Sequence, residues 1–456
     1  MGSLRPRPEP AEPDTHLPRR GTEGVMTILD EARALLATGP LCDACLGRPF
    51  AERSFGLTNP ERGRALRTTL ALAADDPYEP TDADDCWVCE GLCGRYDEFA
   101  DRAVETVADV DYFTYQVGTR VPPLVEENGE LLREEAGLAP DAGELLKSEF
   151  NREVGRRFGA RTDTEVDFER PDVQLLVDLD ADEVSVTLNS VAVYGRYRKV
   201  ERDVPQTEWP CSNCGESGRI HGVGPCPECD GTGYRYPTSV EQEVAPTLVT
   251  ALRGDEGVFH GAGREDVDAL MLGSGRPFVL EVRHPHRRDV DLAALEAEIN
   301  EASDVIEVEG LRFATHDMIA RVKGHDAGKT YRMTVAFDEP VSDADLAAAL
   351  DELRGTTVEQ RTPQRVDHRR ADLTREREVY DISGSTTDET HATLVVDGAG
   401  GLYVKELVSG DEGRTEPSLA GLLGVESTVT ALDVLAVEGD KEPFEHPDFF
   451  RNAEAD

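Results

Sequence analysis

The sequence predicts an α+β protein with at least two folding units, in which cysteine-rich modules precede a larger domain built on a mixed sheet. The 456 residues, of which 39% are hydrophobic, are enough for several separate cores. Eight of the nine cysteines fall into C-x-x-C pairs, all before residue 230. Beyond these pairs, short alternating apolar stretches typical of strands are interspersed with helical patterns, which favours a sheet covered by helices.

The chain begins with a segment that predicts no fold. Residues 1–25 mix Arg, Glu and Pro, and we expect them to form a disordered tail. They lack the apolar stretch of a signal peptide, and no run of about 18 apolar residues follows. We therefore expect a cytoplasmic protein without membrane contact. Thr27 and Asp30 form a capping-box pattern that begins the first helix, which ends at Gly39 and Pro40.

Helical and strand patterns alternate along the rest of the chain. A helix is predicted over residues 142–158, followed by strands at 173–179 and 184–193. Ser239 and Gln242 form the capping pattern of a further helix. The later part predicts helices beginning at Asp291 and Ser342, and strands at 278–282, 306–314, 331–337, 378–382, 391–396, 402–407 and 429–437.

The cysteine pairs predict structural zinc sites. In a cytoplasmic chain, C-x-x-C pairs favour zinc thiolates over disulfides, because each turn directs two sulfurs at one tetrahedral ion. Free buried thiols are the alternative. The first pairs are Cys42/Cys45 and Cys86/Cys89, and Cys93 is left over. The remaining four cysteines have the close spacing of a zinc knuckle: Cys211, Cys214, Cys226 and Cys229.

The net charge of −44 argues at first sight against a nucleic-acid partner, because phosphates would be repelled. Only six of the 48 basic residues are lysines, a composition that resembles proteins adapted to molar salt. In such salt the Debye length falls to roughly 3 Å, so distant carboxylates barely oppose a local cationic patch. The composition therefore does not exclude RNA binding.

Two segments contain residues suited to nucleic-acid chemistry. Residues 194–202, which include Arg196 and Lys199, interleave rings and cations as base stacking and phosphate pairing require. A half-buried strand with a charged outer face is an equal alternative. The Gly-rich turn at 261–268 presents Asp266 and Asp268 before a predicted strand. Taken alone, that turn fits a phosphate cradle, a Mg²⁺ site or a surface loop with solvated acids.

Motifs spread over nearly the whole chain carry a resemblance to one enzyme family. Gly263-Arg264-Glu265-Asp266 is similar to the G-R-x-D signature of pseudouridine synthases. The longer stretch GREDVDALMLGSGRPFVLEV resembles the archaeal and eukaryotic tRNA pseudouridine synthases that act on the TΨC arm. Further segments resemble that family in the same order: LCDACLGRPF, CWVCEGL, YGRYRKVERDVPQT, GKTYR, QRTPQRVDHRRADL and GLYVKELVSGDEGRTEPS.

This resemblance implies conversion of uridine to pseudouridine at position 55 of tRNA, with position 54 as a second candidate and without a catalytic cofactor. Asp266 matches the nucleophile, with Asp268 as the competing carboxylate, and Tyr331 matches a tyrosine that stacks on the base. Lys405 matches the basic residue that keeps the nucleophile ionised and oriented, so it must lie beside Asp266 in a cleft. The expected substrate-binding residues are Arg264, Lys329, Tyr403, Arg196 and Lys199.

The resemblance also implies a domain order. A zinc-stapled module over 26–95 would join Cys42/Cys45 to Cys86/Cys89, and a THUMP-like RNA-binding domain would follow over 96–208. A zinc-knuckle linker over 209–236 and a pseudouridine synthase catalytic domain over 237–450 complete the chain. We expect a monomer that acts on tRNA. The alternative is a non-catalytic zinc-containing tRNA-binding protein or chaperone, which would form no pseudouridine.

Overall fold

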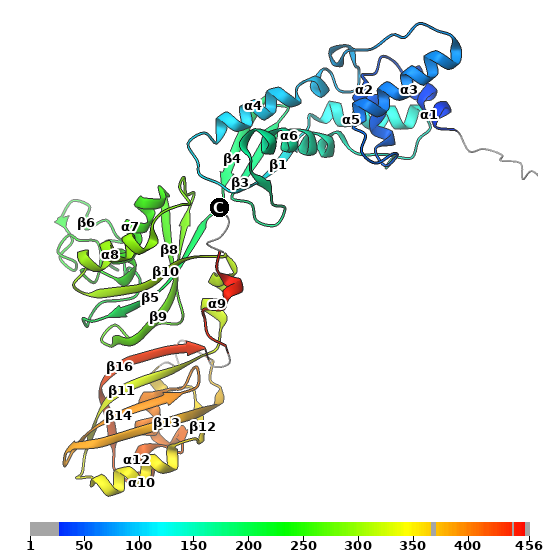
Figure 1. Ribbon diagram of the computed structural model, residues 1–456. Helices are drawn as coiled ribbons and strands as arrows, with labels where there is room; N and C mark the ends of the chain where they lie inside the picture. Colours follow the sequence, from blue (N-terminus) through cyan, green and yellow to red (C-terminus); the bar gives the residue numbers. More distant parts are fainter. Residues whose placement is uncertain (1–26, 366–370, 440–441, 452–456) are drawn as a thin grey trace, which may run out of the picture. The chain divides into compact units, whose positions relative to one another are not determined.

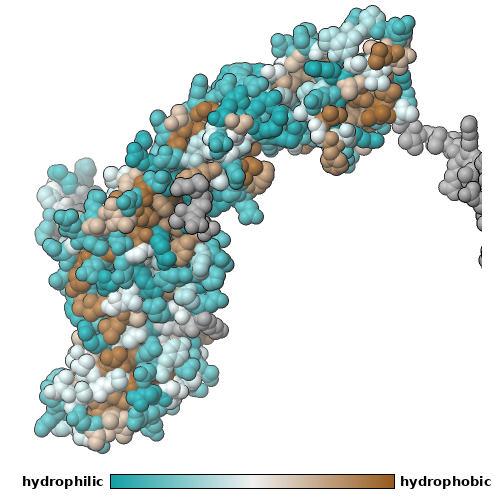
Figure 2. Space-filling model, viewed as in Figure 1, coloured by the Kyte–Doolittle hydropathy of each residue, from teal (hydrophilic) through white to brown (hydrophobic). Residues whose placement is uncertain are grey.

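The computed structural model describes residues 27–365, 371–439 and 442–451 (Figure 1). The chain forms two compact units: the first contains residues up to 106 with 117–163 and 175–185, and the second contains the remainder. The expected tail over 1–25 lies outside the described residues. Hydrophilic residues cover most of the visible face in Figure 2, as the charge of −44 requires. Within the described ranges, no helix has the length and apolar character needed to cross a membrane.

Helices dominate the first unit. The first helix begins with the expected capping box, in which the Thr27 hydroxyl accepts from the Asp30 amide and the Asp30 carboxylate accepts from the Thr27 amide. The helix expected over 142–158 is present, displaced by four residues. The helices are α1 (Ile28–Ala37), α2 (Asp43–Gly47), α3 (Asn59–Ala74), α4 (Tyr96–Thr106), α5 (Pro123–Glu135) and α6 (Leu146–Thr162).

A four-stranded sheet has the order β2-β1-β3-β4, and β1 and β2 pair in parallel. In the chain, β1 lies between α4 and α5, and the other three strands follow α6. Alternate residues of β1 and β3 are buried, and β3 corresponds to the strand expected over 173–179. The strands are β1 (Thr114–Arg120), β2 (Glu165–Val166), β3 (Val173–Asp178) and β4 (Glu183–Leu188). The strand expected over 184–193 is divided, because residues from 191 onward pair in a different sheet.

A ten-stranded mixed sheet forms the centre of the second unit, as predicted. Its order is β10-β5-β9-β16-β11-β14-β13-β12-β15, with β8 paired to β9. β16 and β9 pair in parallel, whereas the other described pairings in this sheet are antiparallel. The strands are β5 (Val191–Lys199), β8 (Glu256–Gly261), β9 (Leu270–Arg283), β10 (Ile306–Ala314), β11 (Ala327–Phe337), β12 (Thr357–Arg361), β13 (Thr374–Asp388), β14 (His391–Gly398), β15 (Thr415–Glu416) and β16 (Ser427–Gly439).

Two hydrophobic cores lie against this sheet. One joins β5, β9 and β10 to α7, α8 and α9, and the other joins β11, β13 and β14 to α10, α11 and α12. Tyr331 packs against both cores, so it marks the place where they meet. The helices are α7 (Val240–Leu252), α8 (Leu292–Ala302), α9 (Asp317–Gly324), α10 (Asp343–Leu353), α11 (Val404–Ser409) and α12 (Leu419–Leu423).

The prediction of a strand over 402–407 is wrong, because the chain forms the short helix α11 there. Val404, Leu407 and Val408 are buried in the second core, and this i, i+3, i+4 spacing is helical. The expected THUMP-like range, 96–208, includes β5, which nevertheless pairs with β9 and β10. The proposed domain borders otherwise remain predictions.

Replacing Phe278 should test the first core. Phe278 is fully buried in β9, and its ring stacks on Phe259 with centroids 5.0 Å apart. We expect Phe278→Ala to lower the free energy of unfolding of the second unit by about 3–5 kcal/mol, because it leaves a large cavity. Val223→Ala, at an exposed position of the same unit, should change it by less than about 0.5 kcal/mol in the same denaturant titration. If both variants lost the same free energy of unfolding, Phe278 would not be part of the core.

Candidate active site

Asp266 and Lys405 form an ion pair in the second unit. Asp266 lies in the turn between β8 and β9, and Lys405 lies in the first turn of α11. The Lys405 ammonium donates to Asp266 Oδ2 over 3.0 Å, although 139 residues separate them in the chain. The side chain of Lys405 is 31% exposed and that of Asp266 is 50% exposed, so the pair remains open to solvent. The two groups therefore meet as the sequence hypothesis requires.

A small cavity of about 160 Å³ opens beside this ion pair. Besides Asp266 and Lys405, it is lined by residues that include Arg264, Arg276, Lys329, Tyr331, Arg365 and Tyr403. Half of the fourteen lining residues are cationic or aromatic, which suits a flat ring attached to a phosphate backbone. A larger open groove of about 1060 Å³ runs past Glu359 and Asp411 and does not include the ion pair. Its acidic border would repel phosphates, so we assign the candidate site to the smaller cavity.

Tyr331 brings a protonated hydroxyl to the cavity. Its position on β11 faces the junction of the two cores. Burial raises the pKa of Tyr331 to about 12, with Arg276 opposing this rise and Asp266 adding to it. The hydroxyl therefore stays protonated at neutral pH, where it can donate a hydrogen bond but does not act as a base.

A buried ionic cluster lies beneath the turn that carries Asp266. The Arg276 guanidinium pairs with Glu265 at 2.8 Å, and the Lys199 ammonium lies 3.8 Å from the same carboxylate. The Tyr197 hydroxyl donates to Glu265 over 2.9 Å. All three charged side chains are at most 1% exposed. Burial lowers the pKa of Lys199, while Glu265 opposes that shift. We call Lys199, Glu265 and Arg276 the buried triad.

The buried triad holds the turn through its backbone. Lys199 donates to the carbonyl oxygens of Val204 and Val267 over 2.8 and 3.0 Å, and Arg276 donates to that of Ala262 over 2.7 Å. The Gln206 amide donates to the Gly263 carbonyl over 3.0 Å. Gly263 has φ +72°, a conformation that favours glycine. The backbone of the turn is therefore fixed from both ends, and it presents Asp266 outward.

The expected substrate-binding residues occupy two different environments. Arg264, Lys329 and Tyr403 line the cavity. Arg196 instead pairs with Glu445 at 2.7 Å and Glu438 at 3.0 Å, and Lys199 is 0% exposed within the triad. Neither of the latter lines the cavity, because β5 is a central strand that is buried along most of its length. Sequence reasoning missed the roles of Glu265 and Arg276; a glutamate inside the G-R-x-D turn was the available signal.

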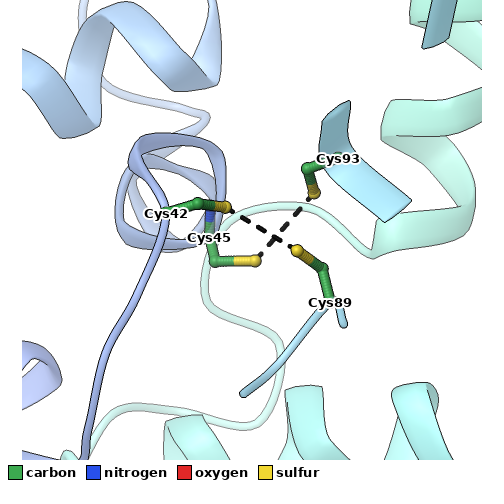
Figure 3. A group of neighbouring side chains, drawn as sticks. All are labelled: Cys42, Cys45, Cys89 and Cys93. Atoms are coloured by element: carbon green, nitrogen blue, oxygen red, sulfur yellow. Dashed lines mark hydrogen bonds between the residues drawn. The ribbon is translucent and has the colours of Figure 1, made fainter. Parts of the chain in front are cut away.

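The first cysteine group comprises Cys42, Cys45, Cys89 and Cys93 and lies in the first, helical unit (Figure 3). Its sulfur atoms all lie within 4.8 Å of one another, with Cys42 and Cys89 3.7 Å apart and Cys45 and Cys93 4.0 Å apart. The expected ligand set had Cys86 in the place of Cys93. Gly91, with φ +90°, precedes the short helical turn Leu92–Gly94 that contains Cys93. The Arg48 guanidinium donates to the Cys93 sulfur over 3.0 Å and so provides positive charge beside the thiols.

The second cysteine group contains the four expected residues, with separations of 3.9 Å for Cys211–Cys226 and 3.7 Å for Cys214–Cys229. A zinc ion bound to four sulfurs at about 2.3 Å places neighbouring sulfurs roughly 3.8 Å apart. Both groups match that spacing. The two tetra-cysteine clusters are therefore consistent with structural zinc sites.

The charge of Glu265 should be essential for folding of the second unit. Glu265→Gln keeps the shape but leaves Lys199 and Arg276 buried without a counter-charge, so we expect the free energy of unfolding to fall by about 3–5 kcal/mol. Glu438→Gln removes the exposed partner of Arg196 and should cost about 0–1 kcal/mol. Denaturant titration of both variants compares them. A similar small effect at both positions would contradict the anchoring role of the triad.

Comparisons with known proteins agree with this geometry. Residues 192–438 match the family described as "Pus10, C-terminal", and residues 99–178 match "Pus10 THUMP domain, archaeal". The tRNA pseudouridine synthase Pus10 of Halorubrum lacusprofundi is 62% identical and aligns over 93% of this chain and 100% of its own. Proteins of the same name from Methanothrix thermoacetophila and Pyrococcus furiosus are 41% and 36% identical, over 90% and 91% of this chain and 95% and 99% of their own.

Among solved structures, a Cbf5-Nop10-Gar1 complex aligns at 17% identity and a TM-score of 0.28, over 43% of this chain and 45% of that one. That overlap is too small to carry an argument. The sequence relatives, by contrast, span both the cysteine-rich front of the chain and the sheet that presents Asp266, Tyr331 and Lys405. The chain belongs to the Pus10 family of tRNA pseudouridine synthases, which are isomerases.

Proposed function

We propose that this chain converts uridine 55 of tRNA to pseudouridine, with uridine 54 as a second candidate target, and that Asp266 is the nucleophile. The observation that carries this proposal is the contact between Asp266 and Lys405 at the mouth of the cavity. A carboxylate held by a neighbouring ammonium group is oriented for attack. The buried triad fixes the backbone beneath it, so the carboxylate needs little reorganisation when the base enters.

The size of the cavity fits one pyrimidine ring. A cavity of about 150 Å³ in another protein accommodates a benzene molecule. The volume of about 160 Å³ beside Asp266 is therefore suited to a single six-membered ring and leaves little room for a purine. A base can enter only after it has left the RNA stack, and the cationic rim would then hold its phosphates.

The proposed reaction conserves every atom of the nucleotide. The Asp266 carboxylate adds either to C6 of the base or to C1′ of the ribose, and the N1–C1′ bond breaks. The uracil turns, C5 bonds to C1′, C5 loses its proton, N1 gains one, and the aspartate is released. Tyr331, protonated at neutral pH, can stack on the ring and donate a hydrogen bond during the turn. No catalytic cofactor enters this sequence.

The two tetra-cysteine clusters are proposed as structural zinc sites, outside the chemistry. The first would comprise Cys42, Cys45, Cys89 and Cys93, and the second Cys211, Cys214, Cys226 and Cys229. Zinc held by four thiolates has no open position for a substrate and acts as a cross-link. In the region of the second cluster, the buried apolar group consists of the cysteines themselves with Ile220 packed against them, so the metal would contribute directly to folding there.

Replacing the nucleophile should abolish the reaction. We expect Asp266→Asn to slow pseudouridine formation in an unmodified T-arm transcript by at least about 10³-fold, because the amide cannot attack. Chemical labelling of pseudouridine in molar KCl measures the rate and the position, and fluorescence anisotropy should show tRNA affinity within about threefold of the unchanged protein. Asp268→Asn is the matched control and should retain activity. Loss of activity only in the Asp268 variant would transfer the role to that residue, and product at neither position 54 nor 55 would exclude the proposed targets.

Elemental analysis should find about two zinc ions per chain, and the variants should identify the ligands. Cys93→Ser should remove one ion and lower the melting temperature, whereas Cys86→Ser should keep both ions, because Cys86 is not one of the four cysteines whose sulfurs all lie within 4.8 Å of one another. Cys214→Ser should remove the second ion. Retention of zinc in the Cys93 variant together with its loss in the Cys86 variant would restore the ligand set expected from the sequence.

A further inference from the structure

Aromatic and guanidinium groups gather between the second cysteine cluster and the turn that carries Asp266. We call residues 209–236, which enclose that cluster, the knuckle. At its base, the rings of Trp209 and Tyr236 lie 5.5 Å apart at 75°, and the Arg235 guanidinium is 5.5 Å from the Trp209 centroid. The guanidinium of Arg264, from the turn that carries Asp266, lies 5.6 Å from the same centroid. Trp209 therefore connects the knuckle to the candidate active site.

The fold of the knuckle sets the position of Trp209. The Arg235 amide donates to the Trp209 carbonyl over 2.9 Å, and the Cys211 amide donates to that of Gly233 over 2.8 Å. These bonds pair the two ends of the knuckle as a short antiparallel ladder. The cysteine sulfurs close the loop directly above it, so a bound metal would lock the register of both ends.

Few contacts other than that with Trp209 restrict the side chain of Arg264. Within the described ranges, its guanidinium forms no hydrogen bond and no ion pair, although the chain contains 92 acidic residues. The side chain is exposed and borders the cavity. A long unpaired arginine samples many rotamers, and contact with a tryptophan face restricts that freedom. Trp209 is thus the contact that determines where Arg264 points.

We propose that the knuckle is a positioning element that holds Arg264 at the cavity through Trp209. Arg264 would then meet the extruded nucleotide in one orientation, while Trp209 itself touches no substrate and is a positioning residue. This inference rests on the proposed function, and it gives the second metal site a role in the reaction: the metal keeps the ends of the knuckle paired, and the paired ends keep Trp209 in place.

A double-mutant cycle tests the coupling. Under single-turnover conditions with a T-arm transcript, we expect Trp209→Ala to slow pseudouridine formation about tenfold while the transcript's dissociation constant changes less than about twofold. Trp209→Phe should recover most of the rate because it keeps a ring for the guanidinium. In an Arg264→Ala background, Trp209→Ala should cause little further loss. Arg219→Gln removes a charge from an exposed strand of the knuckle away from this cluster, and it should leave the rate unchanged.

If the double variant lost rate by the product of the two single-variant factors, the proposal would be overturned. Residues that act through one another do not give independent effects. A Trp209→Ala variant that weakens binding without slowing the single-turnover step would overturn it too, since Trp209 would then be an RNA contact. Full activity in that variant would remove Trp209 from any role in the reaction.

Fluorescence provides a test that needs no catalysis. The chain has only two tryptophans, so Trp87→Phe leaves Trp209 as the sole reporter. In that background, we expect Arg264→Ala to raise the acrylamide quenching constant of Trp209 about twofold. Removal of metal with a chelator should do the same, and added zinc should reverse it. If neither treatment changes quenching, the contact and its dependence on the knuckle are refuted, whether or not the protein forms pseudouridine.

Discussion

The buried triad of Lys199, Glu265 and Arg276 is the constraint on which the site depends. Two cations and one carboxylate in an apolar core are expensive to desolvate, and such a group persists only when its remaining hydrogen bonds are satisfied. Here the carbonyl oxygens of Val267 and Ala262 accept hydrogen bonds from Lys199 and Arg276. The same bonds that stabilise the buried charges therefore immobilise the turn, and Asp266 is presented outward from a segment that cannot move without exposing the triad.

The other functional groups reach this turn from distant parts of the chain. Tyr331 comes from β11 and Lys405 from α11, and these elements belong to the second core, which covers β11, β13 and β14. The cavity thus lies where two hydrophobic cores meet, and Tyr331 packs against both. Because each core supplies only part of the constellation, the site exists only when the whole mixed sheet has formed.

The family resemblance predicted the placement of Asp266 beside Lys405, and periodicity predicted most strands of the mixed sheet. The sequence predictions failed where a local pattern does not show which face of the element is buried. Alternation in 194–202 suggested an outer cationic face, but β5 is a central strand covered on both faces, so Lys199 became a structural cation. Residues 402–407 alternate like a strand, although the helical spacing of Val404, Leu407 and Val408 decides the outcome. Cys93 has no C-x-x-C partner, so its spacing gave no sign that its sulfur lies with those of Cys42, Cys45 and Cys89.

The acidic composition limits the kinds of interaction that can serve this site. In molar salt the Debye length is roughly 3 Å, so attraction between separated charges is nearly lost and only groups in contact still interact. The Asp266–Lys405 pair at 3.0 Å, the buried triad, and the Arg264 guanidinium 5.6 Å from the centre of the Trp209 ring all interact at short range. Shape and contact geometry must therefore provide most of the selectivity for RNA. A long-range positive field is not required, and a chain with a net charge of −44 can bind a polyanion.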